Sequence, residues 1–278
     1  MKKILILLLL LMSNTAFGLM PEKGVSPTTV GQIKNAENAS KLRVWSWVGF
    51  VSGNDEFDPL HTTKKRSTFI AHNENTDEKT HFVFIWFHGM GGYKQSSFEG
   101  VFGFLKWLTN EKELSYTWIM PELPWSANVS HIDGRNAWAK QDSFDLFVKE
   151  AIAKAPKLAK KKNIKYIVAG HSRGGKAIAN AAKTGGLCKV NPHWVIWSDS
   201  TYSRWLETAW NYCLKDIPVF MEIFYMAGTE TQASVKRFEK INNSKLVEIE
   251  GLRSPWYHGK IGNSAIIMSD FLSKLREQ

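Results

Sequence analysis

The sequence predicts an α/β protein in which helices cover both faces of a mostly parallel sheet. Short apolar segments typical of strands alternate with segments of helical periodicity along most of the chain, and this alternation favours parallel strand pairing. The segment over residues 81–87 is apolar at nearly every position, as expected of a strand buried on both faces. No repeat or linker interrupts the pattern, so we expect a single domain over residues 42–278.

The expected strands are short apolar segments that end at turn-forming residues. The strand over residues 116–120 ends at Pro121, and the strand over residues 165–169 runs directly into Gly170. The full set of expected strands covers residues 43–50, 67–72, 81–87, 116–120, 165–169, 193–197, 218–225 and 245–249.

The expected helices carry apolar residues at helical spacing. The lysine-rich end of the helix over residues 137–161 complements the negative end of the helix dipole, and the Gly185-Gly186 pair is expected to stop the preceding helix. Only a few residues separate Trp197 from the helix that begins at Tyr202, so no large lid is expected there. The expected helices cover residues 97–110, 137–161, 174–183, 202–214, 233–241 and 262–275.

The amino terminus has the layout of an export signal. Lys2 and Lys3 precede an apolar run of about nine residues, and small residues occupy the cleavage positions before residue 19. A membrane-crossing helix needs about 20 residues, so the run is too short to be an anchor. We therefore predict a signal peptide over residues 1–18, an irregular arm over residues 19–41, and a periplasmic or secreted protein with no transmembrane segment after cleavage.

The chain is basic, with a formal net charge of +10. Such a charge suits an anionic polymer, a cell-wall surface or anionic lipid, although many exported proteins are basic without a specific partner. Nucleic acid is not an expected partner, because the sequence has no dense row of basic residues on a helix and no nucleic-acid-binding motif.

A serine between two glycines carries the main chemical signal. Gly170, Ser172 and Gly174 form a G-x-S-x-G pattern between an apolar strand and an amphipathic helix, which is the context of a nucleophile elbow. The flanking side chains must be nearly absent for the backbones to approach in this strained turn. We predict that Ser172 is a nucleophile; the alternative is an ordinary serine at a helix N-cap.

A glycine-rich turn over residues 88–92, called here the oxyanion turn, follows the buried strand over residues 81–87 and begins with His88 and Gly89. In such a turn the backbone N–H groups can face the substrate, and two of them can stabilise the oxyanion of acyl transfer. We predict that these donors are the backbone N–H groups of Met90 and Arg173 and that His88 and Gly89 belong to the substrate-binding turn. A plain turn between a strand and a helix is the alternative.

A serine hydroxyl needs a base, and the base needs a carboxylate to orient it. His258 lies between the last strand and the last helix, in the expected order of serine, acid and histidine. His171 is too close to Ser172 in sequence and is expected to face away as part of the elbow. Asp199 and Glu230 each follow a strand; we favour Asp199 because its shorter side chain is easier to hold rigidly, with Glu230 as the alternative acid.

Together these features resemble the α/β-hydrolase superfamily from about Arg43 to the carboxyl terminus. The resemblance implies an eight-stranded, mostly parallel sheet and acyl-enzyme chemistry, but no particular substrate. The matching positions are Gly170, Ser172 and Gly174 in the elbow, His88 and Gly89 in the oxyanion turn, and His258 and Gly259 after the last strand.

The two cysteines, Cys188 and Cys213, have neither a CxxC spacing nor the spacing of metal ligands. In the predicted topology both lie at the edge of the sheet opposite the active site. Because export places them where a disulfide persists, we predict that they pair; two buried thiols are the alternative.

The sequence therefore predicts a hydrolase that cleaves a carboxylic ester, or an amide, without a metal or an organic cofactor. Without a large lid, the site is expected to be open to bulky or polymeric substrates. Together with export and positive charge, this leads to a narrower hypothesis, in which the substrate is cell-envelope or polysaccharide material. A non-catalytic binding protein on the same scaffold and an acyltransferase are the alternatives.

Overall fold

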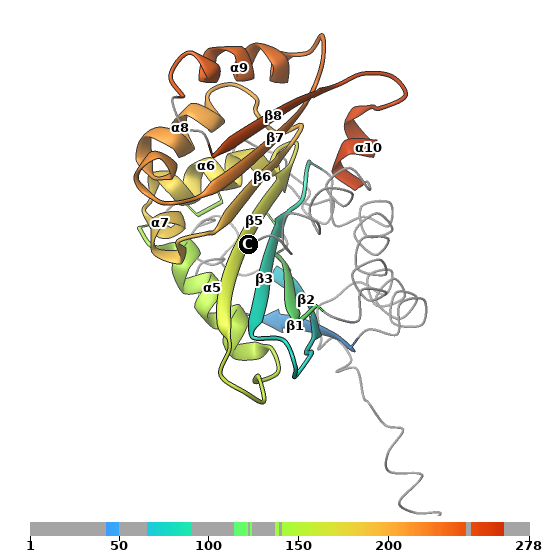
Figure 1. Cartoon of the computed structure of the whole chain (residues 1–278), viewed down its shortest axis with the longest axis vertical. Helices are drawn as coiled ribbons and strands as arrows, with labels where there is room; N and C mark the ends of the chain where they lie inside the picture. Colours follow the sequence, from blue (N-terminus) through green and yellow to red (C-terminus); the bar gives the residue numbers. More distant parts are fainter. Residues whose placement is uncertain are drawn as a thin grey trace, which may run out of the picture.

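A computed structural model describes residues 43–49, 66–90, 114–121, 123, 137–138, 141–242 and 246–263. The predicted export signal over residues 1–18, the arm over residues 19–41 and the helix over residues 97–110 lie outside these ranges. So do residues 264–275 of the expected last helix and Gly91 and Gly92 of the predicted oxyanion turn. Figure 1 shows the described elements around one twisted sheet.

The sheet has eight strands in the order β1-β2-β4-β3-β5-β6-β7-β8. β2 pairs antiparallel with both β1 and β4, and every pairing from β4 through β3 to β8 is parallel, so the predicted mostly parallel sheet is confirmed. The strands are β1 (Arg43–Gly49), β2 (Arg66–Asn73), β3 (Thr80–Phe87), β4 (Tyr116–Pro121), β5 (Asn163–His171), β6 (Trp194–Ser198), β7 (Phe220–Met226) and β8 (Val247–Leu252).

The helices follow the predicted alternation, but several limits differ. The last helix begins at His258, four residues before the expected start at residue 262. α5 is shorter than expected because Ala155, which precedes Pro156, adopts an extended conformation. Gly185, at a φ of 79°, separates α6 from a short helix, α7, that was not predicted. The helices are α5 (Ser143–Lys154), α6 (Gly174–Lys183), α7 (Gly186–Val190), α8 (Trp205–Tyr212), α9 (Glu230–Glu239) and α10 (His258–Asn263), with a short 3₁₀ helix at Leu214–Asp216.

Aromatic side chains fill the space between the sheet and the helices. Figure 1 shows α5, α6, α7 and α8 together on one face of the sheet, with α10 on the other side. On the first face the ring of Phe87 contacts those of Trp138 and Phe144, and Trp138 also contacts Phe147 of α5. All four residues are fully buried, so this cluster forms the core between β3 and α5.

The opposite face of the sheet is buried as well. Trp118 of β4 stacks on Phe84 and Trp86 of β3, with ring centroids 5.7 Å and 5.9 Å apart. Every residue of β3 after Thr80 is buried, as predicted for a strand covered on both faces. Only a short loop joins β6 to α8, so no large lid lies between these elements.

Cys188 of α7 and Cys213, just after α8, form a disulfide with their Cα atoms 5.5 Å apart, which confirms the predicted pairing. The bridge ties together two helices on the same face of the sheet. In the described parts of the chain, no helix has both the length and the apolar character needed to cross a membrane.

Two buried histidines form a polar network between β2, β3 and β4. The ring nitrogens of His81 contact the hydroxyls of Ser115 and Thr117 at 2.8 Å and 2.9 Å, and His72 Nδ1 shares the Thr117 hydroxyl at 2.9 Å. Burial, together with the nearby His72 and Lys162, lowers the pKa of His81 to about 3. His81 is therefore neutral in the folded protein at neutral pH.

The network predicts that the protein loses stability in mild acid. The unfolded chain binds a proton at His81 near pH 6.5, whereas the folded chain binds it only near pH 3. Between these values the free energy of unfolding should fall by up to about 1.4 kcal/mol per pH unit as the pH decreases. Urea unfolding from neutral pH to mild acid measures this slope. His81→Gln, which keeps polar groups without titrating, should make it shallower. Equal slopes for the wild type and the variant would rule out His81 as a source of the pH dependence.

Candidate active site

Ser172 lies in the sharp turn between β5 and α6. Its φ of 52° falls in the left-handed region, which is strained for a residue with a side chain. The Ser172 N–H donates to the carbonyl of Ser198 at the end of β6 (3.3 Å), which ties the turn to the neighbouring strand. Ser172 remains partly exposed, just before the start of α6.

Two glycines allow α6 to begin this close to the sheet. A Cβ atom at Gly174 would lie 2.2 Å from the carbonyl oxygen of Phe87, and one at Gly175 would lie 2.0 Å from the carbonyl oxygen of Ser200. Both distances are far below contact distance, and both neighbours are backbone atoms. The glycines therefore fix how the elbow sits between the ends of β3 and β6.

His258, the first residue of α10, is hydrogen-bonded to Asp199, which follows β6. The distance from His258 Nδ1 to Asp199 Oδ2 is 2.6 Å. The side chain of Asp199 is 2% exposed and that of His258 is 43% exposed. One edge of the imidazole thus contacts a buried carboxylate while much of the ring remains accessible.

Asp199 is held by three hydrogen bonds. Besides the contact with His258, its Oδ1 accepts hydrogen bonds from the Thr231 hydroxyl at 2.6 Å and the Met226 N–H at 3.0 Å. Burial alone would raise the pKa of Asp199, but the hydrogen bonds from His258, Thr231 and Met226 lower it below the ordinary value. The carboxylate is therefore ionised at neutral pH.

Glu230, the alternative acid, does not contact His258. It is the exposed first residue of α9, and its Oε1 accepts a hydrogen bond from the N–H of Ser203 at 3.1 Å. Of the two candidate carboxylates, the fold brings only Asp199 to the histidine.

Two residues beside His258 were not identified from the sequence. The Tyr202 hydroxyl lies 3.3 Å from His258 Nδ1. His171 was expected to face away, and this was wrong: its ring centroid lies 4.6 Å from that of His258, and its Nε2 lies 2.9 Å from the His258 carbonyl oxygen. His171 and His258 are 87 positions apart in the sequence, so no local pattern relates them.

The turn after β3 lies against the elbow. A Cβ atom at Gly89 would be 3.0 Å from the Cβ of Ser172, and Met90 Sδ lies 3.7 Å from a guanidinium nitrogen of Arg173. Met90 is 61% exposed. The structure thus brings together the two residues whose N–H groups were predicted to stabilise an oxyanion.

His88 is buried and holds this turn through backbone hydrogen bonds, so its ring does not line the site. Its Nε2 accepts a hydrogen bond from the Leu123 N–H at 2.9 Å, so the proton of the neutral ring is on Nδ1, which donates to the Gly89 carbonyl at 2.7 Å. The carbonyl and the N–H of a trans peptide point in opposite directions. The Met90 N–H therefore points away from His88.

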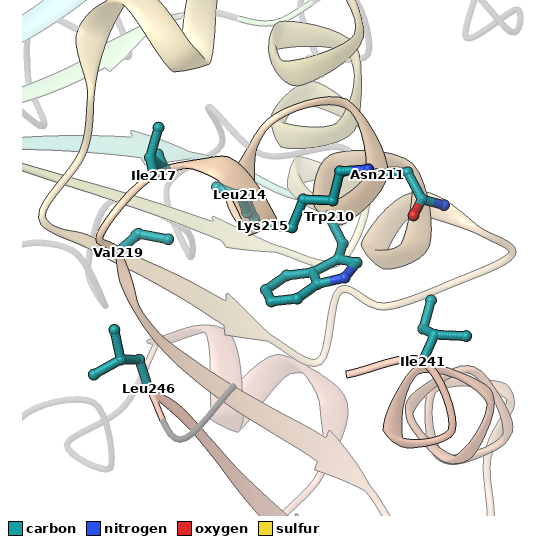
Figure 2. Close-up of a pocket in the computed structure, with 8 residues that line it drawn as sticks. All are labelled: Trp210, Asn211, Leu214, Lys215, Ile217, Val219, Ile241 and Leu246. Atoms are coloured by element: carbon teal, nitrogen blue, oxygen red, sulfur yellow. The ribbon is translucent and has the colours of Figure 1, made fainter. Parts of the chain in front are cut away.

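A separate cavity of about 540 Å³ lies at the amino-terminal ends of β7 and β8, whereas Ser172 and Asp199 follow the carboxyl-terminal ends of β5 and β6. Figure 2 shows the indole of Trp210 among the lining residues, between Ile241 and Val219. Its lining contains no serine, histidine or carboxylate. Among the described residues, no group of three or more histidine, cysteine or acidic side chains is arranged to hold a metal ion.

The sequence matches no protein-family model, and no curated protein matches it. The structure is similar to that of a ferulic acid esterase, with a TM-score of 0.52 and 13% identity over 76% of this chain and 90% of that one. It is also similar to a predicted CIB-like hydrolase from Thermoplasma acidophilum, with a TM-score of 0.51 and 14% identity over 84% of this chain and 99% of that one. Together with the strand order, these similarities show that the chain has the α/β-hydrolase fold.

Gly175 lies so close to the Ser200 backbone that adding a single methyl group should lower the stability of the protein strongly. Gly175→Ala should lower the free energy of unfolding by about 3 kcal/mol, because the new Cβ meets the Ser200 backbone. Gly259→Ala is the matched control, since a Cβ there makes only ordinary contacts, the nearest at 3.5 Å, and it should not lower stability. Chemical unfolding of both variants provides the comparison; equal losses would contradict the packing argument.

Proposed function

We propose that this protein is a serine hydrolase that cleaves carboxylic esters through an acyl-enzyme on Ser172. One observation carries the proposal: His258, hydrogen-bonded at 2.6 Å to the buried Asp199, has its ring against the residue that precedes Ser172. A histidine oriented by a buried carboxylate beside a nucleophile elbow is the arrangement that activates a serine hydroxyl.

In the first half-reaction, Ser172 Oγ attacks the ester carbonyl carbon, and its proton passes to Nε2 of His258. The Nδ1–H of His258 continues to donate to Asp199, whose negative charge stabilises the imidazolium. The N–H groups of Met90 and Arg173 stabilise the oxyanion. The imidazolium then gives its proton to the departing alcohol, or to an amine if the substrate is an amide.

In the second half-reaction, water attacks the acyl carbon and gives a proton to His258, which returns it to Ser172 as the carboxylic acid leaves. All of these groups belong to the protein, so the reaction requires no metal or organic cofactor. If an alcohol replaced water in this step, the same site would act as an acyltransferase.

An activated serine should react with a fluorophosphonate probe. We expect labelling of the mature protein at Ser172 alone, as determined by peptide mass spectrometry, and loss of labelling in Ser172→Ala and His258→Ala. Ser203→Ala, at an exposed serine outside the proposed triad, is the control and should label like the wild type. A folded protein that does not label would instead support a non-catalytic binding protein on this scaffold.

The identity of the acid predicts opposite results for two carboxylates. Asp199→Asn should reduce kcat for a p-nitrophenyl ester by about 10⁴-fold, because the amide no longer holds the reactive tautomer of His258. Glu230→Gln should leave the rate unchanged, since Glu230 contacts the Ser203 N–H instead. A large loss in Glu230→Gln with an active Asp199→Asn would reverse the assignment.

We also propose that the protein is periplasmic or secreted and acts on cell-envelope or polysaccharide esters. The predicted signal over residues 1–18, the disulfide between Cys188 and Cys213 and the net charge of +10 support this. The wild type, but not Ser172→Ala, should then release acyl groups from isolated cell walls, as detected by mass spectrometry. No release by a preparation that hydrolyses a p-nitrophenyl ester would favour a small ester or a lipid as substrate.

A further inference from the structure

We propose that His171 is a positioning residue that holds the backbone and ring of His258 beside the nucleophile. The inference rests on the proposed function, because it assigns to His171 the task of orienting the general base. His171 is the last residue of β5 and directly precedes Ser172, so one strand end carries both the nucleophile and the support for its base.

The hydrogen bond between the two histidines has a defined direction. His171 Nε2 lies 2.9 Å from the carbonyl oxygen of His258, and a carbonyl can only accept. His171 Nε2 must therefore carry a hydrogen and donate it. The two rings lie 4.6 Å apart between centroids and are inclined by 37°, so His171 contacts both the backbone and the imidazole of His258.

The His171 ring is enclosed by two glycines. A Cβ atom at Gly262 of α10 would lie 2.4 Å from ring atoms of His171, and one at Gly89 would lie 3.1 Å from its Nδ1. The absence of side chains at both positions leaves space for the ring between α10 and the turn after β3. The ring therefore lies between α10, which carries the base, and the turn after β3.

The charge state of His171 suits this role. Burial and the neighbouring His258 lower its pKa to about 4; His88 acts in the same direction, whereas the His258 carbonyl and Asp199 act in the opposite one. His171 is therefore neutral at neutral pH. A charged His171 would repel the imidazolium that forms in the reaction.

The segment before His258 has few other anchors. Residues 253–257, which join β8 to α10, are all exposed except Trp256, which is partly buried. Asp199 holds the imidazole through Nδ1, and the contact with His171 holds the backbone that carries it. Loss of this hydrogen bond would let the general base shift relative to Ser172, and displacements of about 1 Å can cost about 100-fold in rate.

His171→Met and His171→Gln form a matched pair. Both side chains are unbranched and similar in length, but only Gln offers an N–H donor to the His258 carbonyl. We expect His171→Met to lower kcat for a p-nitrophenyl ester by about 100-fold with little change in KM, and His171→Gln to recover most of it. His193→Met, at the other end of the sheet, is the control and should retain the wild-type rate. Equal rates for the Met and Gln variants, with both folded, would overturn the proposal.

Proton NMR of the His258 Nδ1–H, which donates to Asp199, provides a readout independent of turnover. We expect its downfield resonance in the wild type and in His171→Gln, and its broadening or loss in His171→Met. An unchanged resonance in His171→Met would overturn the inference even if no substrate were hydrolysed. Failure of the proposed function is a different result: the wild type would neither label with fluorophosphonate nor hydrolyse the ester.

If His171→Met does not fold, the wild type still decides the question. Nitrogen chemical shifts of labelled histidine should show His171 as the neutral Nε2–H tautomer down to about pH 5, since its pKa lies near 4. An Nδ1–H tautomer of the neutral ring would leave Nε2 without a hydrogen and would contradict the hydrogen bond on which the proposal depends.

Discussion

The site depends on the close approach of the first turn of α6 to the ends of two neighbouring strands. Without Cβ atoms at Gly174 and Gly175, the helix start reaches the carbonyl groups of Phe87 and Ser200. Because β3, β5 and β6 are adjacent in the sheet, this packing sets the spacing between the oxyanion turn, Ser172 and the loop that carries Asp199. The sheet therefore acts as a rigid base on which three separate segments are aligned.

Three histidines lie around the nucleophile elbow, and their surroundings give them different roles. His88 accepts from one backbone N–H and donates to one backbone carbonyl, so both of its ring nitrogens are engaged by the backbone. His171 is enclosed, neutral and bound to a carbonyl. Only His258 combines a buried carboxylate partner with an accessible ring, and this combination makes it the candidate base.

Local sequence patterns determined the parts of the structure that depend on local chemistry. The apolar alternation located the strands, because burial on a sheet face requires it, and the spacing of Gly170, Ser172 and Gly174 located the elbow. Helix limits were less accurate where one residue decides the backbone: Ala155 before Pro156 ends α5 early, and Gly185 separates α7 from α6. The order of serine, acid and histidine identified His258 as the histidine after the last strand, although the structure makes it the first residue of α10 and not a loop residue.

Tertiary structure decided which polar residues meet. Asp199 and His258 are 59 positions apart, and the choice of Asp199 over Glu230 depended on which strand end faces the loop before α10. The contact of His171 with His258 and the burial of His88 beneath the oxyanion turn likewise arise from packing between distant segments. Residue type and spacing give the capacity of a side chain for chemistry, whereas its burial, its partners and its protonation depend on neighbours that only the folded chain supplies.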